Sequence, residues 1–371
     1  PPEDQGTAPV TPGSWHVIGS RDFGGADRFY CRLVQALQGT GDAVLAVNRT
    51  GSPVGQVIGG SVPQFQLPFA NQWDAYTAWR IHRRAVRERP AIVQTYMGRA
   101  TRLTRLSRRG PTVHVARLGG FYKVRGYYEH AHAWAGNTRG VCDHLVQAGL
   151  PAGRIYRIGN FVPAAQPLAP GEAERRRRAE SIAQEAWVLF ALGRLVPGKG
   201  FEDLLAAFAL LPPELGGRPV HLAVGGEGAL RPALEGQANA LGVARRVHWL
   251  GWLADPAPWY GLADLLIVPS RHETLGNVIL EGWSHACPVV ATRTAGATEL
   301  IEPGVSGVLA PVADAGALAA AVREALLAAP ADRAALGRAG AECVAREHGE
   351  EAVVGAYRQL YRDLYRQRVA P

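Results

Sequence analysis

Cysteine and long apolar runs are both scarce in this 371-residue sequence. Its four cysteines lie far apart in the chain, so no close pair predicts a disulfide framework or a zinc site, and we expect a reducing, cytoplasmic environment. The longest apolar run, residues 204–213, is about half of the ~18 residues that a membrane span requires. Disulfide-rich and integral-membrane classes are therefore excluded.

Lysine is nearly absent as well, because all but two of the 40 basic residues are arginine. The two lysines, Lys123 and Lys199, stand out for that reason, although chance is an alternative explanation. Residues 1–165 contain 20 basic and 9 acidic residues, whereas residues 166–371 contain 20 and 23. An arginine-rich genome or an anionic partner of the first half would explain this bias. With 47% hydrophobic residues, the chain can build sizeable cores, which excludes disordered and fibrous classes.

The two halves of the chain begin in the same way, with a short buried strand, a glycine-containing loop and a helix. In the first half the strand is residues 15–19 and the loop 20–27; in the second they are 187–193 and 194–200. Further strands recur at the spacing of βα units, which predicts parallel sheets covered on both faces. We therefore expect an α/β protein with two Rossmann-like, doubly wound domains that face a central cleft.

Composition also predicts the domain boundaries. Residues 1–14 are polar and rich in proline, which predicts a flexible arm. A linker rich in proline and alanine then separates a first domain, residues 15–165, from a second domain, residues 166–349. The amphipathic segment 350–371 predicts a long helix that packs back on the first domain.

The strongest local signal lies in residues 270–292, between two predicted strands. Helical spacing predicts a buried stripe of Leu275, Val278, Ile279, Gly282 and Ala286. Glu273 and Glu281 bracket the amino end of this helix, where N–H groups without a helical partner favour an anion. The alternative is a helix with one capping and one solvated glutamate.

The segment GRLVPGKG, residues 193–200, follows a predicted strand and so lies at the edge where open α/β sheets bind ligands. Arg194 offers a bidentate fork for phosphate oxygens, and Lys199 offers a point charge near the next helix. It is not a phosphate loop of the GxxxxGKS/T kind, because Phe201 stands where a hydroxyl is needed. A solvated turn is the alternative. The loop with Gly24 and Gly25 favours either a close ligand approach or a plain turn.

Four of these segments together resemble family 4 glycosyltransferases of the GT-B fold. They are the pair Glu273 and Glu281, the segment 193–201, the GGAD loop at 24–27, and AGATELIEPGVSGVLAPVAD at 295–314. The resemblance covers nearly all of residues 187–348 and is looser over residues 15–165.

The resemblance implies retaining transfer of a sugar from a nucleotide diphosphate donor to an acceptor. It implies that Glu273 holds sugar hydroxyls and that Glu281 holds the ribose hydroxyls. Arg194 and Lys199 would neutralise the diphosphate. Further donor contacts are implied for Gly24, Gly25, Trp252, Leu253, Thr274, Leu275, Gly276, Asn277 and Val278.

The sequence also bears on the need for a metal ion. A departing diphosphate concentrates negative charge on its β-phosphate, so the site must supply fixed positive charge there. No Asp-x-Asp pair occurs in the sequence to hold a divalent ion. Arg194, Lys199 and a helix amino end are the available substitutes. We therefore expect no metal and no cofactor, and predict activity without added metal.

The first domain departs from the family at its strand ends. Many relatives carry histidine where the strands face the donor sugar, whereas Tyr96 and Arg117 occupy those positions here. His114 lies two or three residues earlier, and strand alternation points it into the sheet. No general base is assigned, and Arg117 is expected to stabilise charge. His272, beside Glu273, is the histidine expected in the cleft.

Ten arginines lie between residues 80 and 109, with Glu88 as the only acid. The expected basic helix face consists of Arg80, Arg83, Arg84 and Arg87, with Trp73, Tyr76 and Trp79 just upstream. This combination favours an anionic membrane surface or a phosphorylated acceptor. A solvated arginine face is the alternative. Together with the family resemblance, this basic helix favours a particular acceptor. We expect a cell-envelope glycolipid or polysaccharide of lipopolysaccharide type at the cytoplasmic membrane face.

Two other readings of the function stay open. Among GT-B enzymes they are a sugar-nucleotide epimerase and a phosphorylase, and a phosphorylase with pyridoxal phosphate would need Lys199 for its Schiff base. From another class, the arginines of residues 80–109 are compatible with a nucleic-acid-binding protein, although no stacking platform accompanies them. The donor base, the sugar, the acceptor and the oligomeric state do not follow from the sequence.

Overall fold

The computed structural model describes residues 13–369 and divides into two compact units. One unit consists of the residues up to Asn160 together with those from Glu350 on, and the other is Phe161–Gly349. The division falls at the start of the predicted linker. The arm expected for residues 1–14 lies outside the described residues except at its end, where Ser14 already begins the first strand.

The first unit contains a seven-stranded parallel sheet of order β3-β2-β1-β4-β5-β6-β7. Its strands are β1 (Ser14–Ile18), β2 (Val44–Arg49), β3 (Gln64–Leu67), β4 (Ile92–Tyr96), β5 (Val113–Leu118), β6 (Ala133–Gly136) and β7 (Ile155–Arg157). Its helices are α1 (Gly25–Gly39), α2 (Pro53–Ile58), α3 (Ala75–Glu88), α4 (Met97–Leu103), α5 (Arg139–Gln147), the short η1 (Ala152–Arg154) and α14 (Glu350–Val369).

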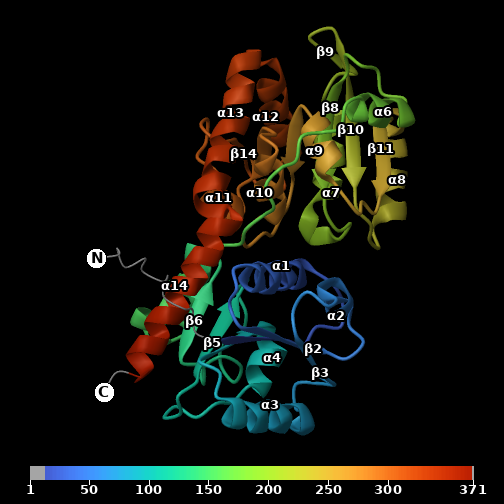
Figure 1. The fold of residues 1–371 in the computed structure, drawn as a ribbon. Helices are drawn as coiled ribbons and strands as arrows, with labels where there is room; N and C mark the ends of the chain where they lie inside the picture. Colours follow the sequence, from blue (N-terminus) through green and yellow to red (C-terminus); the bar gives the residue numbers. More distant parts are fainter. Residues whose placement is uncertain (1–12, 370–371) are drawn as a thin grey trace. The chain divides into compact units, whose positions relative to one another are not determined.

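Helices cover both faces of this sheet, with α1 and α2 on one side and α3 and α4 on the other (Figure 1). The chain winds outward from β1 in both directions, so β2 and β4 are its two neighbours. The carboxyl ends of these three strands therefore meet at a topological switch point, the place where doubly wound sheets bind ligands.

The terminal helix α14 belongs to the first unit. Its buried residues recur at helical spacing from Val353 to Leu364, which gives it one apolar face. Polar contacts tie it down: the Tyr361 hydroxyl donates to Gln94 Oε1 at 2.9 Å, and Arg358 Nε lies 3.0 Å from Asp42 Oδ2. The chain thus returns to the first unit with this helix, after it has formed the second unit.

The second unit has a parallel sheet of order β11-β10-β8-β12-β13-β14, with the short β9 antiparallel to β10. Its strands are β8 (Trp187–Leu192), β9 (Glu214–Leu215), β10 (Arg218–Gly225), β11 (Val247–Gly251), β12 (Leu265–Val268), β13 (Val289–Thr292) and β14 (Val308–Ala310). Its helices are α6 (Glu172–Ala179), η2 (Pro197–Lys199), α7 (Phe201–Ala209), α8 (Arg231–Ala240), η3 (Ala244–Arg246), α9 (Ala257–Leu262), α10 (Asn277–Ser284), α11 (Ala295–Leu300), α12 (Ala315–Leu327), α13 (Pro330–Cys343) and η4 (Val344–His348).

Apolar clusters fill both faces of this sheet. One lies under α7, α8 and α12, and the other lies under α9, α10 and α11. The α/β architecture with two doubly wound units is therefore confirmed. Within residues 13–369, no helix combines the length and the apolar character that crossing a membrane requires. All four cysteines are free thiols.

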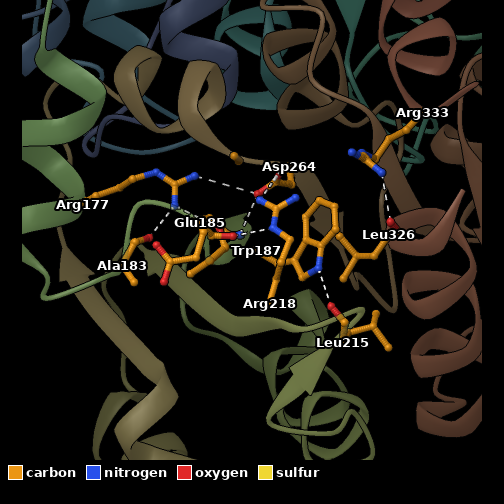
Figure 2. A network of polar contacts seen from close by, with 12 residues as sticks. Arg177, Ala183, Glu185, Trp187, Leu215, Arg218, Asp264, Leu326 and Arg333 are labelled. Atoms are coloured by element: carbon orange, nitrogen blue, oxygen red, sulfur yellow. Dashed lines mark hydrogen bonds and ion pairs between the residues drawn. The ribbon is translucent and has the colours of Figure 1, made fainter. Parts of the chain in front are cut away.

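A polar network fixes the amino ends of the strands in the second unit (Figure 2). Asp264 Oδ2 accepts a hydrogen bond from the Val188 backbone at 2.9 Å, and the Arg218 guanidinium stacks 3.4 Å from the centre of the Trp187 ring. Burial raises the pKa of Asp264. This network lies at the amino edge of the sheet. The opposite, carboxyl edge, from which the loops extend, is available for ligands.

Candidate active site

An ion pair lies beyond the carboxyl edge of the second sheet. Lys199 ends the short helix η2 after β8, and Glu273 lies in the loop after β12. The Lys199 ammonium donates to Glu273 Oε2, although the two residues are 74 positions apart. Their side chains keep 24% and 20% of their surface exposed, so both are open to a ligand. The structure thus brings together two residues that the sequence predicted for one site.

Glycine backbone allows these two loops to touch. Gly200 has φ +67°, and a Cβ at this position would overlap the carbonyl oxygen of Pro269. The neighbouring Gly198 carbonyl accepts hydrogen bonds from the backbone N–H of Arg271 at 3.0 Å and of His272 at 3.2 Å. The Lys199 turn is therefore packed main chain against main chain on the Glu273 loop.

A second ion pair, which the sequence analysis missed, locks the same loops. Arg271 donates from Nε and Nη2 to the two carboxylate oxygens of Asp203, each at 2.7 Å. Such a fork fixes direction as well as distance. The two residues are 68 positions apart, and no motif links them, so only the fold reveals the pair. His272 is exposed beside it, and its side chain has no role that these contacts define.

The helix after Glu273 begins later than its spacing predicted. α10 starts at Asn277, and Gly276 caps it with φ +94°. The stripe expected from Leu275 to Ala286 is therefore wrong at both ends: Leu275 is buried in the preceding loop, and Ala286 is exposed after the helix. Ile279 N–H already bonds to Gly276 O at 2.9 Å. The preceding N–H groups, including that of Val278, have no acceptor inside a helix and are directed at its amino end.

The loop between Glu273 and α10 also packs against the amino end of α11. Gly296 N–H donates to Glu273 O at 3.0 Å, and a Cβ on Gly296 would lie 2.5 Å from the carbonyl carbon of Leu275. Thr274 is half-buried in the same loop. The amino end of α11 is therefore the support on which the predicted donor-binding loop rests.

Glu281 lies one turn into α10 and is held in place by Tyr260. The buried Tyr260 hydroxyl lies 3.0 Å from Glu281 Oε2 and is a donor to that carboxylate. The Tyr260 ring stacks on His285, with centroids 5.5 Å apart. The second carboxylate of the predicted pair is thus oriented by a residue that the sequence analysis did not single out.

Two other loops, after β10 and β11, meet the Lys199 loop at this edge through their backbones. Gly193 N–H bonds to Gly225 O at 3.1 Å, and Gly226 N–H bonds to Gly251 O at 2.7 Å. Arg194, next to Gly193, is exposed and lies on the same loop as Lys199. The predicted base contacts follow Gly251: Trp252 is 61% exposed and Leu253 is half-buried.

In the first unit, the predicted glycine loop caps α1. Gly24 is the capping residue, and its backbone N–H donates to Asp27 Oδ2 at 3.0 Å. Gly24 and Gly25 are both exposed, which leaves their backbone accessible. Burial raises the pKa of Asp27.

The two strand-end residues expected in the cleft are buried instead. Tyr96 is 1% exposed, and its hydroxyl lies 2.8 Å from His16 Nδ1 and accepts from Gln94 Nε2 at 2.7 Å. Burial lowers the pKa of His16 to about 3. Arg117 is 3% exposed and donates to Asn160 Oδ1. Both positions belong to the packing of the first unit, which explains why histidine is not needed there.

The remaining contacts of these residues confirm a structural role. Arg117 also lies over the Phe29 ring at 3.9 Å and bonds to the Tyr357 hydroxyl of α14 at 3.3 Å. His114 is fully buried, and its Nε2 lies 2.9 Å from Thr95 Oγ1, as strand alternation predicted.

The four arginines predicted on one face of α3 divide into two pairs. Arg84 covers the Phe65 ring at 4.4 Å, and Arg80 lies 5.5 Å from the same ring, so both border the core. Arg83 and Arg87 are exposed, and Arg83 stacks on Trp79 at 5.2 Å. The exposed apolar residues of this region are Trp73, Tyr76, Trp79 and Val86, which are 68%, 52%, 49% and 61% exposed.

No group of three or more metal-ligating side chains is close enough to hold an ion anywhere in residues 13–369. The carboxyl edge itself presents exposed cations, two oriented carboxylates and backbone N–H groups.

Comparison with known proteins identifies the family. The family model described as glycosyl transferases group 1 matches residues 186–328. The lipopolysaccharide core biosynthesis glycosyltransferase LpsE of Rhizobium meliloti is 31% identical over 339 residues, which cover 91% of this chain and 95% of LpsE.

Solved structures show the same fold. A glycosyltransferase from Rickettsia africae superposes with a TM-score of 0.83 at 17% identity, covering 95% of this chain and 98% of its own. Anabaena HepE in complex with UDP-glucose gives 0.79 at 19% identity, covering 95% and 100%. From the similarity to LpsE across nearly its whole length, the chain belongs to the group 1 glycosyl transferases, a family 4-type group of GT-B glycosyltransferases.

Proposed function

We propose that this glycosyltransferase is a retaining enzyme that takes its sugar from a nucleotide diphosphate donor bound by the second unit. The observation that carries the proposal is the Lys199–Glu273 pair beside the amino end of α10. A cation, a carboxylate and the amino end of a helix at one place match a diphosphate next to a sugar with several hydroxyls. The complex of HepE with UDP-glucose supports the donor class.

Each group has a defined task in this proposal. The acceptor hydroxyl oxygen forms a bond to the anomeric carbon while the bond from that carbon to the diphosphate oxygen breaks. The acceptor's proton passes to the departing diphosphate, which carries the remaining negative charge away. Lys199 and Arg194 stabilise that charge, which grows in the transition state. Glu273 accepts hydrogen bonds from sugar hydroxyls, and Glu281, oriented by Tyr260, accepts them from the ribose. No step requires a metal ion.

A binding screen tests the donor assignment. UDP-, GDP-, ADP- and TDP-sugars are added in the presence of EDTA, and the midpoint of thermal unfolding is measured. We expect one of these donors to raise the midpoint, since a ligand that binds only the folded state stabilises it by mass action. Glu281→Gln should weaken the shift, and Glu235→Gln, on the distant α8, should not. The donor assignment fails if none of the four raises the midpoint with or without magnesium.

We further propose a cell-envelope glycolipid or polysaccharide of lipopolysaccharide type as the acceptor, reached at the cytoplasmic membrane face. LpsE, named for lipopolysaccharide core biosynthesis, supports this class. The outer surface of α3 supports the membrane contact, because exposed aromatic rings and arginines suit the interface of an anionic bilayer.

Flotation with liposomes tests the membrane contact. We expect binding to anionic vesicles at low salt, weaker binding at high salt, and loss of binding in a Trp79→Ser, Arg83→Gln double variant. The matched control is Arg323→Gln, an exposed arginine of α12. Equal flotation with neutral vesicles, or none with anionic ones, would remove the membrane from the proposal.

A further inference from the structure

Three arginines meet at the switch point of the first sheet. Arg49 ends β2, Arg21 follows β1, and Arg99 lies in α4, directly after β4. These are three neighbouring strands, so their carboxyl ends bring the arginines to one edge although the residues are up to 78 positions apart. Neither the family resemblance nor the donor site accounts for this cluster, which we call the arginine triad.

The triad is organised around a few backbone carbonyls. Arg49 Nη1 donates to Phe69 O at 2.9 Å, and Arg99 Nη1 donates to the same oxygen at 3.4 Å and to Gly19 O at 2.9 Å. Arg21 Nη2 donates to the adjacent Ala70 O at 2.8 Å. Each guanidinium has five N–H donors, so these bonds leave most donors of every arginine available.

No acidic side chain neutralises the triad. Within residues 13–369, neither Arg21, Arg49 nor Arg99 has a carboxylate within 4.0 Å. Asp74, four residues after Ala70, accepts instead from backbone N–H groups, that of Ala70 at 2.9 Å and that of Thr77 at 2.9 Å.

The electrostatics reflect three close positive charges. Burial lowers the pKa of Arg99, and the charges of Arg21 and Arg49 lower it further. Surface arginines that only contact water are expected to stay apart, because like charges repel. An anion between them would remove that repulsion.

The turn that holds the triad is itself strained. Phe69 has φ +45°, although it is not glycine, and its side chain is fully buried. A Cβ on Gly19 would lie 2.7 Å from the Phe69 ring, so Gly19 is required for this packing. Backbone strain of this kind concentrates at ligand sites. Here it directs the Phe69 and Ala70 carbonyls at the three guanidinium groups.

We propose that the arginine triad binds an anionic substituent, a phosphate or a carboxylate, of the acceptor saccharide. This deepens the proposed function and rests on its assignment of the donor to the second unit, which leaves the ligand edge of the first unit to the acceptor. Planar guanidinium forks match both oxyanions bidentately. The enzyme would then select an acceptor that an earlier phosphorylation, or the transfer of an acidic sugar, has already made anionic.

Binding of small probes tests the triad directly. Glucose 6-phosphate, galacturonate and neutral glucose are titrated calorimetrically into the Lys199→Ala protein, which lacks one of the two proposed donor-site cations. We expect the phosphate or the carboxylate probe to bind and glucose not to bind. Arg21→Gln and Arg49→Gln should weaken binding at least roughly ten-fold, since each removes charge-assisted hydrogen bonds. Arg125→Gln, an exposed arginine of the same unit, is the matched control.

The outcomes separate this proposal from the proposed function. Preference for glucose 6-phosphate or for galacturonate identifies the acceptor's anionic group, and either preference supports the triad. Arg21→Lys should recover part of the affinity, which excludes a folding defect. If neither anion binds, or if the triad variants bind as well as Arg125→Gln, the proposal is overturned. Failure of the proposed function is read separately, from the donor screen: anion binding that the triad variants weaken supports the triad even where no donor raises the unfolding midpoint. Arg125→Gln, outside both sites, should leave donor hydrolysis unchanged in the protein with Lys199 intact.

Discussion

At the scale of single residues, the donor site depends on positions where a side chain is missing. Gly200 carries the Lys199 turn across Pro269, and Gly276 starts α10 in a left-handed conformation. At both positions a Cβ would collide with a neighbour while the backbone is already in a region that glycine prefers. The atoms proposed to bind the donor, by contrast, come from the residues next to these glycines.

Gly200→Ala should therefore be strongly destabilising. Its Cβ would overlap a backbone oxygen, and its φ of +67° adds strain, so we expect a loss of about 2–3 kcal/mol in the free energy of unfolding. Urea unfolding measures this loss. Gly198→Ala, two residues away and with open space around it, should change stability by less than about 1 kcal/mol. Equal effects of the two substitutions would contradict the packing of the two loops.

At the scale of secondary-structure elements, two loops behave as one support. The turn before α7 and the loop after β12 are joined by the Arg271–Asp203 fork, by the Gly198 carbonyl and by the Lys199–Glu273 pair. Asp203 sits in the first turn of α7, where a carboxylate also favours the helix. The Arg271–Asp203 fork and the Gly198 carbonyl thus fix the position of the turn that carries Lys199.

Asp203→Asn should lower the turnover rate more than the affinity for the donor. Loss of the fork lets the Lys199 loop shift, and a misplacement of about 1 Å can cost up to roughly a hundred-fold in rate. We expect a decrease of kcat of about ten-fold with KM changed much less. Glu202→Gln is the control, since Glu202 lies 3.9 Å from Arg271 and forms no fork. Steady-state kinetics with the donor found in the screen provide both values, and an unchanged kcat in Asp203→Asn would show that the fork is dispensable.

The sequence was sufficient to predict the secondary-structure elements, but it predicted only part of the candidate site. Alternating strands and helices, and the rule that ligands lie at carboxyl strand ends, predicted the two doubly wound units and placed Lys199 and Glu273 together. The prediction from the sequence failed where one residue changes the path of the chain. Because of Gly276, α10 begins later than the spacing of the apolar residues indicated. The Arg271–Asp203 fork and the arginine triad join residues from separate loops, so no local pattern could reveal them.

At the scale of the whole molecule, buried histidines make the stability of the first unit depend on pH. This unit buries His16 and His114 completely, and burial lowers the pKa of both, that of His16 to about 3. Acid should therefore destabilise the first unit.

We expect the first unit to lose stability as the pH falls from 7.5 to 5.5. Unfolded histidine takes up a proton near pH 6.5, whereas the buried neutral form does not, so the unfolded state binds more protons and stability rises with pH. Each buried histidine lowers the free energy of unfolding by about 1.4 kcal/mol for every pH unit below pH 6.5. Urea unfolding followed by tryptophan fluorescence at several pH values measures the slope. His16→Gln should reduce it, whereas the exposed His82→Gln should not; identical slopes would contradict a buried neutral His16.

The most direct test of the donor site compares the only two lysines of the chain. Turnover of the donor sugar nucleotide is measured in EDTA for the wild type, Lys199→Ala and Lys123→Ala, with the unfolding midpoint of each protein as a check on folding. If Lys199 stabilises the departing diphosphate, Lys199→Ala lowers kcat by about 10²–10³ with a smaller change in KM, and Lys123→Ala retains full activity. Equal activity of the two folded variants, or turnover that EDTA abolishes in the wild type, would contradict the account.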